Sequence, residues 1–378
     1  EGRHPGTTGR MHRLIADHIR NRELPETDLV DAFIAQRARK LGTDFTKAPE
    51  LWEIDSVIDA LPNVLTRKPE LLEQVPDFNQ VALRYVTDTR IAVMLQDMVK
   101  QLSGTNTRTS FIAHMLLGNS LKNTEPAKAL ENYQESLTIT RHLAEILPSD
   151  LQARRDLAVS LDNVADMLKY NDSTQALELY RKSLAIRRNL ADARPGDFRT
   201  PWELAASLDN VAGMLENSDP VQALELYEES LAIGHDLADA LPGDFRALRD
   251  LTVSLDNVAG MLENSDLERA LKLYGESLAI SRDLFKQLPG NLQALWDLAV
   301  SAARLAQLLS TEDPERVSLW REAANSFRDA LAIQPEHREL GRLSYQAALD
   351  YADCHPDDRD EWLAHAAELA ERFGFGKQ

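Results

Sequence analysis

The sequence predicts an all-α protein built from tandem helical hairpins. Prolines recur at intervals of 47, 47, 47 and 46 residues, at Pro148, Pro195, Pro242, Pro289 and Pro335. Between successive prolines, apolar residues recur every three or four positions, which is the spacing of one face of an α-helix. No sustained alternation of apolar and polar residues indicates a β-strand. A regular period filled with two helical patterns predicts one hairpin per interval.

The interval 243–289 shows both helices of a hairpin. The first is carried by "LRDLTVSLDNVAGMLEN", whose apolar stripe consists of Leu248, Leu251, Leu255, Val258, Ala259 and Leu262. The second helix is predicted to begin after "NSD". Ser and Asp side chains can accept the free amide hydrogens of a helix N-terminus, so they favour a helix start there. Its apolar side carries Leu271, Tyr274, Leu278, Leu284 and Leu288. Pro289-Gly290 then ends the helix.

The same pattern divides the chain into five hairpins between two end regions. The hairpins are expected at 105–148, 149–195, 196–242, 243–289 and 290–335. Residues 1–10 are expected to be a disordered lead, and 11–104 a helical region with a degenerate repeat whose second helix spans 81–102. Residues 336–378 are expected to form a capping hairpin. One hairpin cannot bury both of its faces, so neighbours should stack into a superhelix with a concave surface lined by the first helices.

The hairpins resemble the tetratricopeptide repeat family in the residues where their two helices meet. The first helices carry a large-small pair, at Val164-Ala165, Val211-Ala212, Val258-Ala259 and Leu305-Ala306. The second helices carry Ala, Tyr and Ser at matching positions, as in Ala223, Tyr227 and Ser230. The family's usual repeat has about 34 residues, so these longer units are most similar to the extended repeats of kinesin light chains and of bacterial signalling and defence proteins. The resemblance implies a right-handed α-solenoid with an N-terminal helical cap, and peptide or protein binding.

Composition narrows the class of partner. The 378 residues include 61 acidic and 42 basic side chains, for a formal net charge of -19. Such a surface repels nucleic acid and anionic membranes, so we expect neither as a partner. A protein or peptide with basic residues fits better. The single cysteine, Cys354, excludes an intramolecular disulfide framework, which favours a cytoplasmic location.

The candidate binding site is a polar row on the first helices. The stretch "SLDNVAGMLENSD" occurs unchanged at 207–219 and 254–266, and a close variant begins at Ser160. The resemblance places the residues before each large-small pair on the concave face. An Asn side chain can hold a peptide backbone as donor and acceptor, an adjacent Asp favours Lys or Arg, and Gly leaves room for a ligand backbone. The expected site comprises Asp162, Asn163, Asp166, Asp209, Asn210, Gly213, Asp256, Asn257, Gly260 and Arg304.

Two simpler explanations compete with a binding site. Recent duplication alone could keep the identical words, and the glycines could serve close packing against the next repeat. If the row does bind, the chain is an interaction scaffold or adaptor, or else the sensor region of a larger bacterial signalling or defence effector.

Catalysis has little support in the sequence. An Arg followed at a short distance by His, as in helical ribonucleases of the HEPN type, occurs at Arg13-His18, Arg108-His114 and Arg359-His365, so a helical ribonuclease is a further alternative function. Cys354 and His355 are adjacent, which is a poor arrangement for a nucleophile and its base. The histidines show no paired metal-ligand spacing, and no Walker-type phosphate loop is present. We therefore expect no enzyme activity, no metal and no cofactor.

Overall fold

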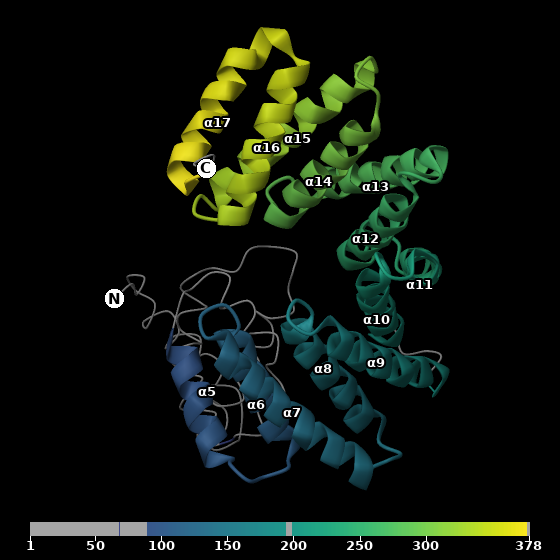
Figure 1. The fold of residues 1–378 in the computed structure, drawn as a ribbon, viewed down its shortest axis with the longest axis vertical. Coiled ribbons are helices and arrows are strands. Elements are labelled where there is room, and N and C mark those ends of the chain that lie inside the picture. The colour runs from purple at the N-terminus through teal and green to yellow at the C-terminus, as the bar shows by residue number, and fades with distance from the viewer. Residues whose placement is uncertain (1–67, 69–88, 194–198, 376–378) are drawn as a thin grey trace, which may run out of the picture. The chain divides into compact units, whose positions relative to one another are not determined.

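The computed structural model describes residues 68, 89–193 and 199–375. Every regular element in these ranges is a helix, so the all-α prediction is confirmed (Figure 1). The chain divides into two compact units, residues 1–195 and 196–378, which are described separately below. The expected lead at 1–10 and most of the expected N-terminal helical region lie outside the described residues.

In its described residues, the first unit shows helix α5 followed by two hairpins. Helix α5 (Thr89–Gln101) contacts α6 (Arg108–Leu121), which pairs with α7 (Pro126–Ile146). Helix α8 (Leu151–Leu168) packs on α7 and pairs with α9 (Ser173–Ala193). The helix predicted at 81–102 corresponds to α5 where the structure describes it.

The second unit contains four hairpins in sequence. Its helices are α10 (Arg199–Leu215), α11 (Pro220–Ala240), α12 (Phe245–Leu262), α13 (Leu267–Gln287), α14 (Leu292–Leu308), α15 (Pro314–Ile333), α16 (Arg338–Cys354) and α17 (Arg359–Phe373). A short 3₁₀ helix, η2 (Pro356–Asp358), joins the last two. Each helix of this unit contacts the next along the chain, so the hairpins stack consecutively. Below, "first helices" are those with even numbers from α6 to α16, and "second helices" those with odd numbers from α7 to α17.

Aspartate side chains cap the starts of α9, α11 and α13. Asp172, Asp219 and Asp266 each accept the backbone amide hydrogen of the residue three positions later, at 3.0, 3.1 and 3.1 Å. These are the Asp residues of the "NDS" and "NSD" words, so the predicted caps are confirmed. Such a cap contributes about 1 kcal/mol to helix stability.

In the four hairpins from α6–α7 to α12–α13, a tyrosine from the second helix packs on a small residue of the first helix. Tyr133, Tyr180, Tyr227 and Tyr274 are 2–4% exposed, and Ala165, Ala212 and Ala259 are fully buried. Glycine replaces alanine in the α6 hairpin, where a Cβ at Gly118 would lie 2.6 Å from the Tyr133 ring. The large-small pattern of the sequence therefore brings the helices together as the resemblance implies.

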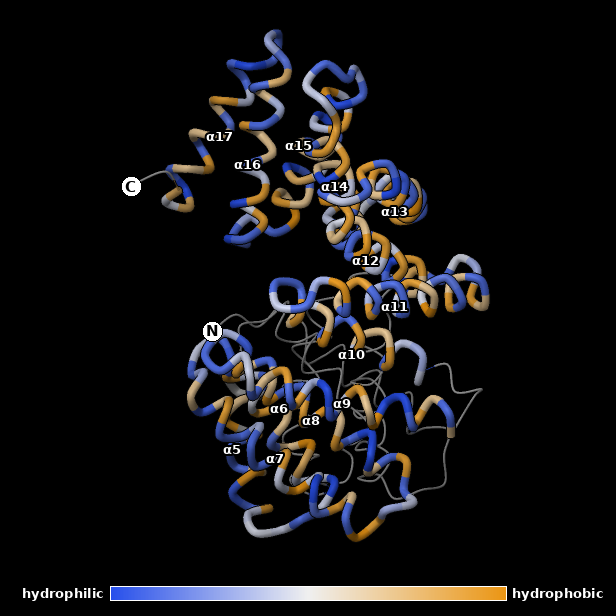
Figure 2. The backbone as a smooth tube through the Cα atoms, turned by 45° about the vertical axis from the view of Figure 1, so that its right-hand side comes forward, coloured by the Kyte–Doolittle hydropathy of each residue, from blue (hydrophilic) through white to orange (hydrophobic). Residues whose placement is uncertain are grey.

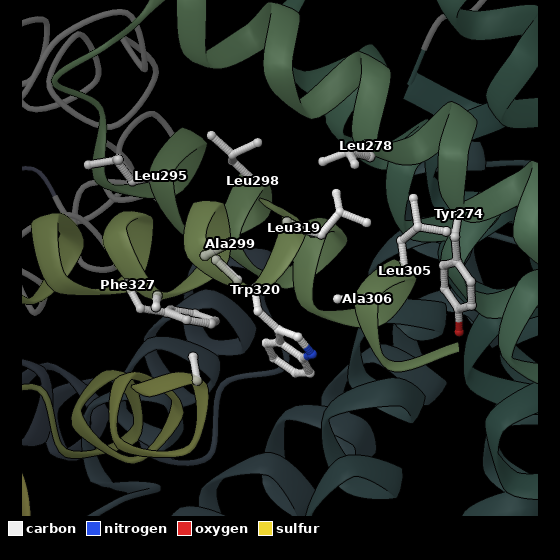
Figure 3. Packing of buried hydrophobic residues seen from close by; sticks show 14 of the residues in the cluster. Tyr274, Leu278, Leu295, Leu298, Ala299, Leu305, Ala306, Leu319, Trp320 and Phe327 are labelled. Carbon is white, nitrogen blue, oxygen red and sulfur yellow. The ribbon is translucent and has the colours of Figure 1, made fainter. Parts of the chain in front are cut away.

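Leucines fill the space between these contacts. Leu278 of α13, Leu298 of α14 and Leu319 of α15 belong to one buried cluster and point into a common space (Figure 3). Along each helix of the second unit, short apolar and polar stretches follow one another (Figure 2), as expected for helices that bury one side. Leu251, Leu255, Val258, Ala259 and Leu262 of the predicted α12 stripe are buried.

We predict that Gly118→Ala destabilises the protein, because the added methyl would overlap the Tyr133 ring. Overpacking of this kind costs about 1–3 kcal/mol. The matched control is Gly275→Ala in α13, where a Cβ meets nothing within 4 Å. That change should stabilise its helix by up to about 1 kcal/mol, since alanine has the higher helix propensity. Thermal unfolding of the two variants checks this; a shift of the same sign in both would contradict it.

Candidate functional site on the first helices

Three first helices of the second unit present an exposed stripe. In α10 it runs through Ala206, Asn210 and Gly213, which are spaced four and three residues apart and so share one helix face. The same positions in the next two first helices are Val253, Asn257 and Gly260 in α12 and Val300, Arg304 and Gln307 in α14. We call these nine residues the first-helix stripe. Its apolar row is Ala206, Val253 and Val300, its polar row is Asn210, Asn257 and Arg304, and its outer row is Gly213, Gly260 and Gln307.

The stripe is accessible in all three rows. Val253 is 40% exposed although it is apolar. Ala206, Gly213, Gly260 and Gln307 are exposed, while the two asparagines, Arg304 and Val300 are half-buried. An apolar row that remains open beside amide side chains is the composition of a surface that can hold another chain.

The aspartates next to the asparagines have different surroundings. Asp256 is only 8% exposed, and Asp162 and Asp209 are half-buried. In all three, the Oδ1 atom is buried and lacks a hydrogen-bond partner. The sequence places each Asp and its Asn on the same open face, but the structure buries one carboxyl oxygen of each Asp, and in α12 Asp256 is buried while Asn257 is half-buried.

Arginines neutralise two of these three aspartates from different directions. In the first unit, Asp162 Oδ2 lies 2.6 Å from Nη2 of Arg187, which comes from the second helix of the same hairpin. In the second unit, Asp256 Oδ2 lies 3.2 Å from Nη1 of Arg304, which comes from the next first helix. Two positions in the repeat can therefore supply the counter-charge.

Asp209 has neither arginine. The position equivalent to Arg187 is Gly234, and the position equivalent to Arg304 is Asn257. Within the described chain, Asp209 forms no ion pair. The pKa of Asp209 is raised from 3.8 to about 6, mainly by burial and also by the Asp250 carboxylate, while hydrogen bonding from Ser230 and Asn257 opposes the rise. Burial also raises the pKa of Asp162 and of Asp256, but there the arginine opposes the shift.

A second row of ion pairs joins the starts of successive first helices. Arg108 Nε lies 2.6 Å from Asp156 Oδ2, and Arg249 Nε lies 2.8 Å from Asp297 Oδ2. The equivalent position in α10 is Trp202, which cannot pair with a carboxylate.

Asp250 of α12 therefore has no arginine from the preceding repeat. Its ion pair is a 3.7 Å contact with Arg246 of its own helix, and that guanidinium stacks 4.8 Å from the Trp202 ring. Both rows of ion pairs are thus interrupted between α10 and α12.

The tyrosine hydroxyls have different hydrogen-bond partners where Gly213 and Gly260 replace the Asp166 of α8. Tyr180 donates its hydroxyl hydrogen to Asp166. Where glycine replaces this Asp, the hydroxyl instead reaches a Glu three residues further on, at 2.7 Å in both Tyr227–Glu216 and Tyr274–Glu263.

The glycines are not required for packing against the next repeat. A Cβ at Gly213 or Gly260 would lie 3.4 or 3.5 Å from the tyrosine oxygen of its own hairpin, which is ordinary contact. No other atom of the described residues, apart from the helix's own backbone and the chain neighbours, would lie within 4 Å. The exposed backbone at these two positions therefore has room for a ligand.

The Arg-His pairs have other contacts where they are described. Arg108 pairs with Asp156, and His114 Nδ1 lies 3.0 Å from Asn132 Oδ1. Arg359 pairs with Asp353, and burial lowers the pKa of His365. Arg13 and His18 lie outside the described residues.

The remaining candidates form no recognisable catalytic or metal centre. His355, beside Cys354, stacks on Tyr351, and its ring nitrogens face Arg321 at 3.2 Å and Asp358 at 3.3 Å. Among the residues with described positions, no three His, Cys, Asp or Glu side chains gather as a metal site. The described helices include none long and apolar enough to span a membrane.

Comparison with known proteins gives a likeness of fold. No family model matches the chain, and no curated protein matches it. Similar solved structures include a Rap protein complexed with competence and sporulation factor, at 14% identity and a TM-score of 0.47 over 91% of this chain and 92% of that one.

Two further solved structures show the same kind of likeness. A STAND protein with a tetratricopeptide repeat sensor, from Pyrococcus horikoshii, has 15% identity and a TM-score of 0.41 over 92% of this chain and 54% of its own. The human IFIT1 dimer with m7Gppp-AAAA has 13% identity and a TM-score of 0.40 over 94% and 74%. At these values the likeness is one of helical-repeat fold alone, and it says nothing about which ligands this chain binds.

Sequence reasoning missed the apolar row of the stripe. Ala206, Val253 and Val300 lie three residues before the Asp position, off the buried side of their helices. The signal was present, because a small or β-branched apolar residue recurs there at the 47-residue period. In the sequence, this recurring apolar residue cannot be distinguished from the neighbouring apolar residues that are buried.

We predict that Asp209→Asn stabilises the folded protein near pH 8, by at most about 3 kcal/mol. The folded-state pKa of Asp209 lies above the ordinary 3.8, so its stabilising contribution is complete below pH 3.8 and is lost as the pH rises through about 6. The gain in unfolding midpoint should therefore shrink as the pH falls from 8 toward 4.

Asp162→Asn is the matched control, because it removes a carboxylate that pairs with the buried guanidinium of Arg187. This change should lower the unfolding midpoint at pH 8. A loss of stability of similar size in both variants would show that Asp209 has a counter-charge.

Proposed function

We propose that this chain is a non-catalytic interaction module whose first-helix stripe binds an extended protein segment. The observation that carries the proposal is the open stripe itself, which repeats an apolar, a polar and an outer position on three consecutive first helices. An extended segment crossing these helices would meet the same kind of contact at regular intervals.

Each row supplies a different part of the binding. Ala206 and Val253 offer apolar surface to side chains of the segment. Asn210 and Asn257 can donate to its carbonyl groups and accept from its amide groups, so they hold the main chain without selecting a sequence. Gly213 and Gly260 let a backbone approach closely.

Charge favours a basic segment. The net charge of -19 attracts a cationic partner and repels nucleic acid and anionic membranes. An adaptor and the sensor region of a larger effector would use this same surface, so one experiment addresses both.

We predict that the wild-type chain enriches binders from a library of displayed random peptides, and that the triple variant Asn210→Ala, Val253→Ser, Asn257→Ala binds them about tenfold or more weakly. The loss follows from removing both amides and the exposed valine from the centre of the stripe. Fluorescence anisotropy with the enriched peptides measures it.

The control removes comparable exposed apolar surface elsewhere. Val221 and Leu267, at the starts of α11 and α13, are 70% and 49% exposed, so Val221→Ser with Leu267→Ser should leave affinity unchanged. Absence of any enriched peptide, or equal loss in both variants, would refute the proposal.

A further inference from the structure

Asp209 is the position in the stripe region where a counter-charge is missing. We propose that a lysine or arginine side chain of the bound segment supplies this charge by pairing with Asp209 Oδ2. This inference rests on the proposed function, because the cation arrives as part of the segment that the stripe holds.

Arg304 shows that an aspartate at this depth can be reached from the stripe. Its guanidinium pairs with Asp256 Oδ2 at 3.2 Å, yet its side chain remains 43% exposed. The same route to Asp209 passes Asn257, which is shorter than arginine and carries no charge. A partner's basic side chain entering beside Asn257 would take the place that Arg304 takes one repeat later.

The groups around Asp209 favour a cation. Helix α11 contributes the Ser230 hydroxyl, and α12 contributes the Asn257 amide and the Asp250 carboxylate. Asp250 lacks an inter-repeat arginine because Trp202 occupies that position. Two carboxylates without an arginine from a neighbouring repeat therefore face the same region between α10 and α12.

The cation would gain more here than at an exposed carboxylate. A hydrogen bond between two charged groups is roughly twice as strong as a neutral one, and partial burial reduces its screening by solvent. The pairing would also fix the register of the segment, because the basic residue must sit at Asp209 while its neighbours contact Ala206 and Val253. The stripe would thus require one basic residue at one defined position.

The experiment selects displayed random peptides on the full chain in three forms: wild type, Asp209→Asn and Asn257→Arg. Peptides selected by the wild type should share Lys or Arg at one fixed position. Such a peptide should bind Asp209→Asn about tenfold more weakly. It should also bind Asn257→Arg more weakly, because the new guanidinium imitates Arg304 and occupies the carboxylate.

A double-mutant cycle isolates the pair. Changing the peptide's fixed basic residue to Met should weaken binding to the wild type by the same factor and should make binding insensitive to Asp209→Asn. Circular dichroism confirms that each variant is folded, and Asn257→Arg tests the pairing without removing the carboxylate.

The outcomes separate this inference from the proposed function. If the wild type enriches peptides that share no basic position, or if Asp209→Asn keeps the same basic preference, the inference is overturned while the stripe still binds. If the wild type enriches no peptide at all, the proposed function and the inference fall together.

Discussion

In the four hairpins from α6–α7 to α12–α13, the contact between a tyrosine of the second helix and a small residue of the first helix holds the hairpin together. The rings leave little room beneath them: alanine fits under three of them, but a Cβ at Gly118 would lie 2.6 Å from the Tyr133 ring. Its hydroxyl hydrogen bonds near the end of the same first helix, so one side chain sets both the spacing of the two helices and the position of the first helix's last turns.

This tyrosine also determines what the stripe exposes. In the α8 hairpin the hydroxyl engages Asp166, which covers the backbone at that position. In the next two hairpins it engages Glu216 and Glu263 instead, and the place of Asp166 is taken by Gly213 and Gly260. The change of partner keeps the buried hydroxyl satisfied while it leaves the helix surface bare. The tyrosine therefore affects both the contact between the two helices and the exposure of the first helix's backbone.

The sequence predicts the fold well because the fold depends on local patterns. The helical spacing of Leu251, Leu255 and Val258, and the caps at Asp219 and Asp266, are set by nearby residues. The candidate site could be predicted only as a set of positions. Whether an arginine of the next first helix reaches an Asp of the row, as Arg304 reaches Asp256, depends on how one repeat stacks on the next. Ion pairs such as Arg249–Asp297 join residues that lie one repeat and one position apart. The sequence of a single helix therefore cannot predict them.

Duplication explains why the Asp-Asn words are identical, but not why their surroundings differ. Asp162, Asp209 and Asp256 occupy equivalent positions, yet the residues that can supply a counter-charge are Arg187 for the first, Arg304 for the last and neither for Asp209. An uncompensated, half-buried carboxylate with a pKa near 6 opposes folding at neutral pH. Stability alone would favour asparagine there, since asparagine has the same shape without the charge. A role in binding a cation accounts for the aspartate, because the charge that weakens the free protein is the one that a basic partner would neutralise.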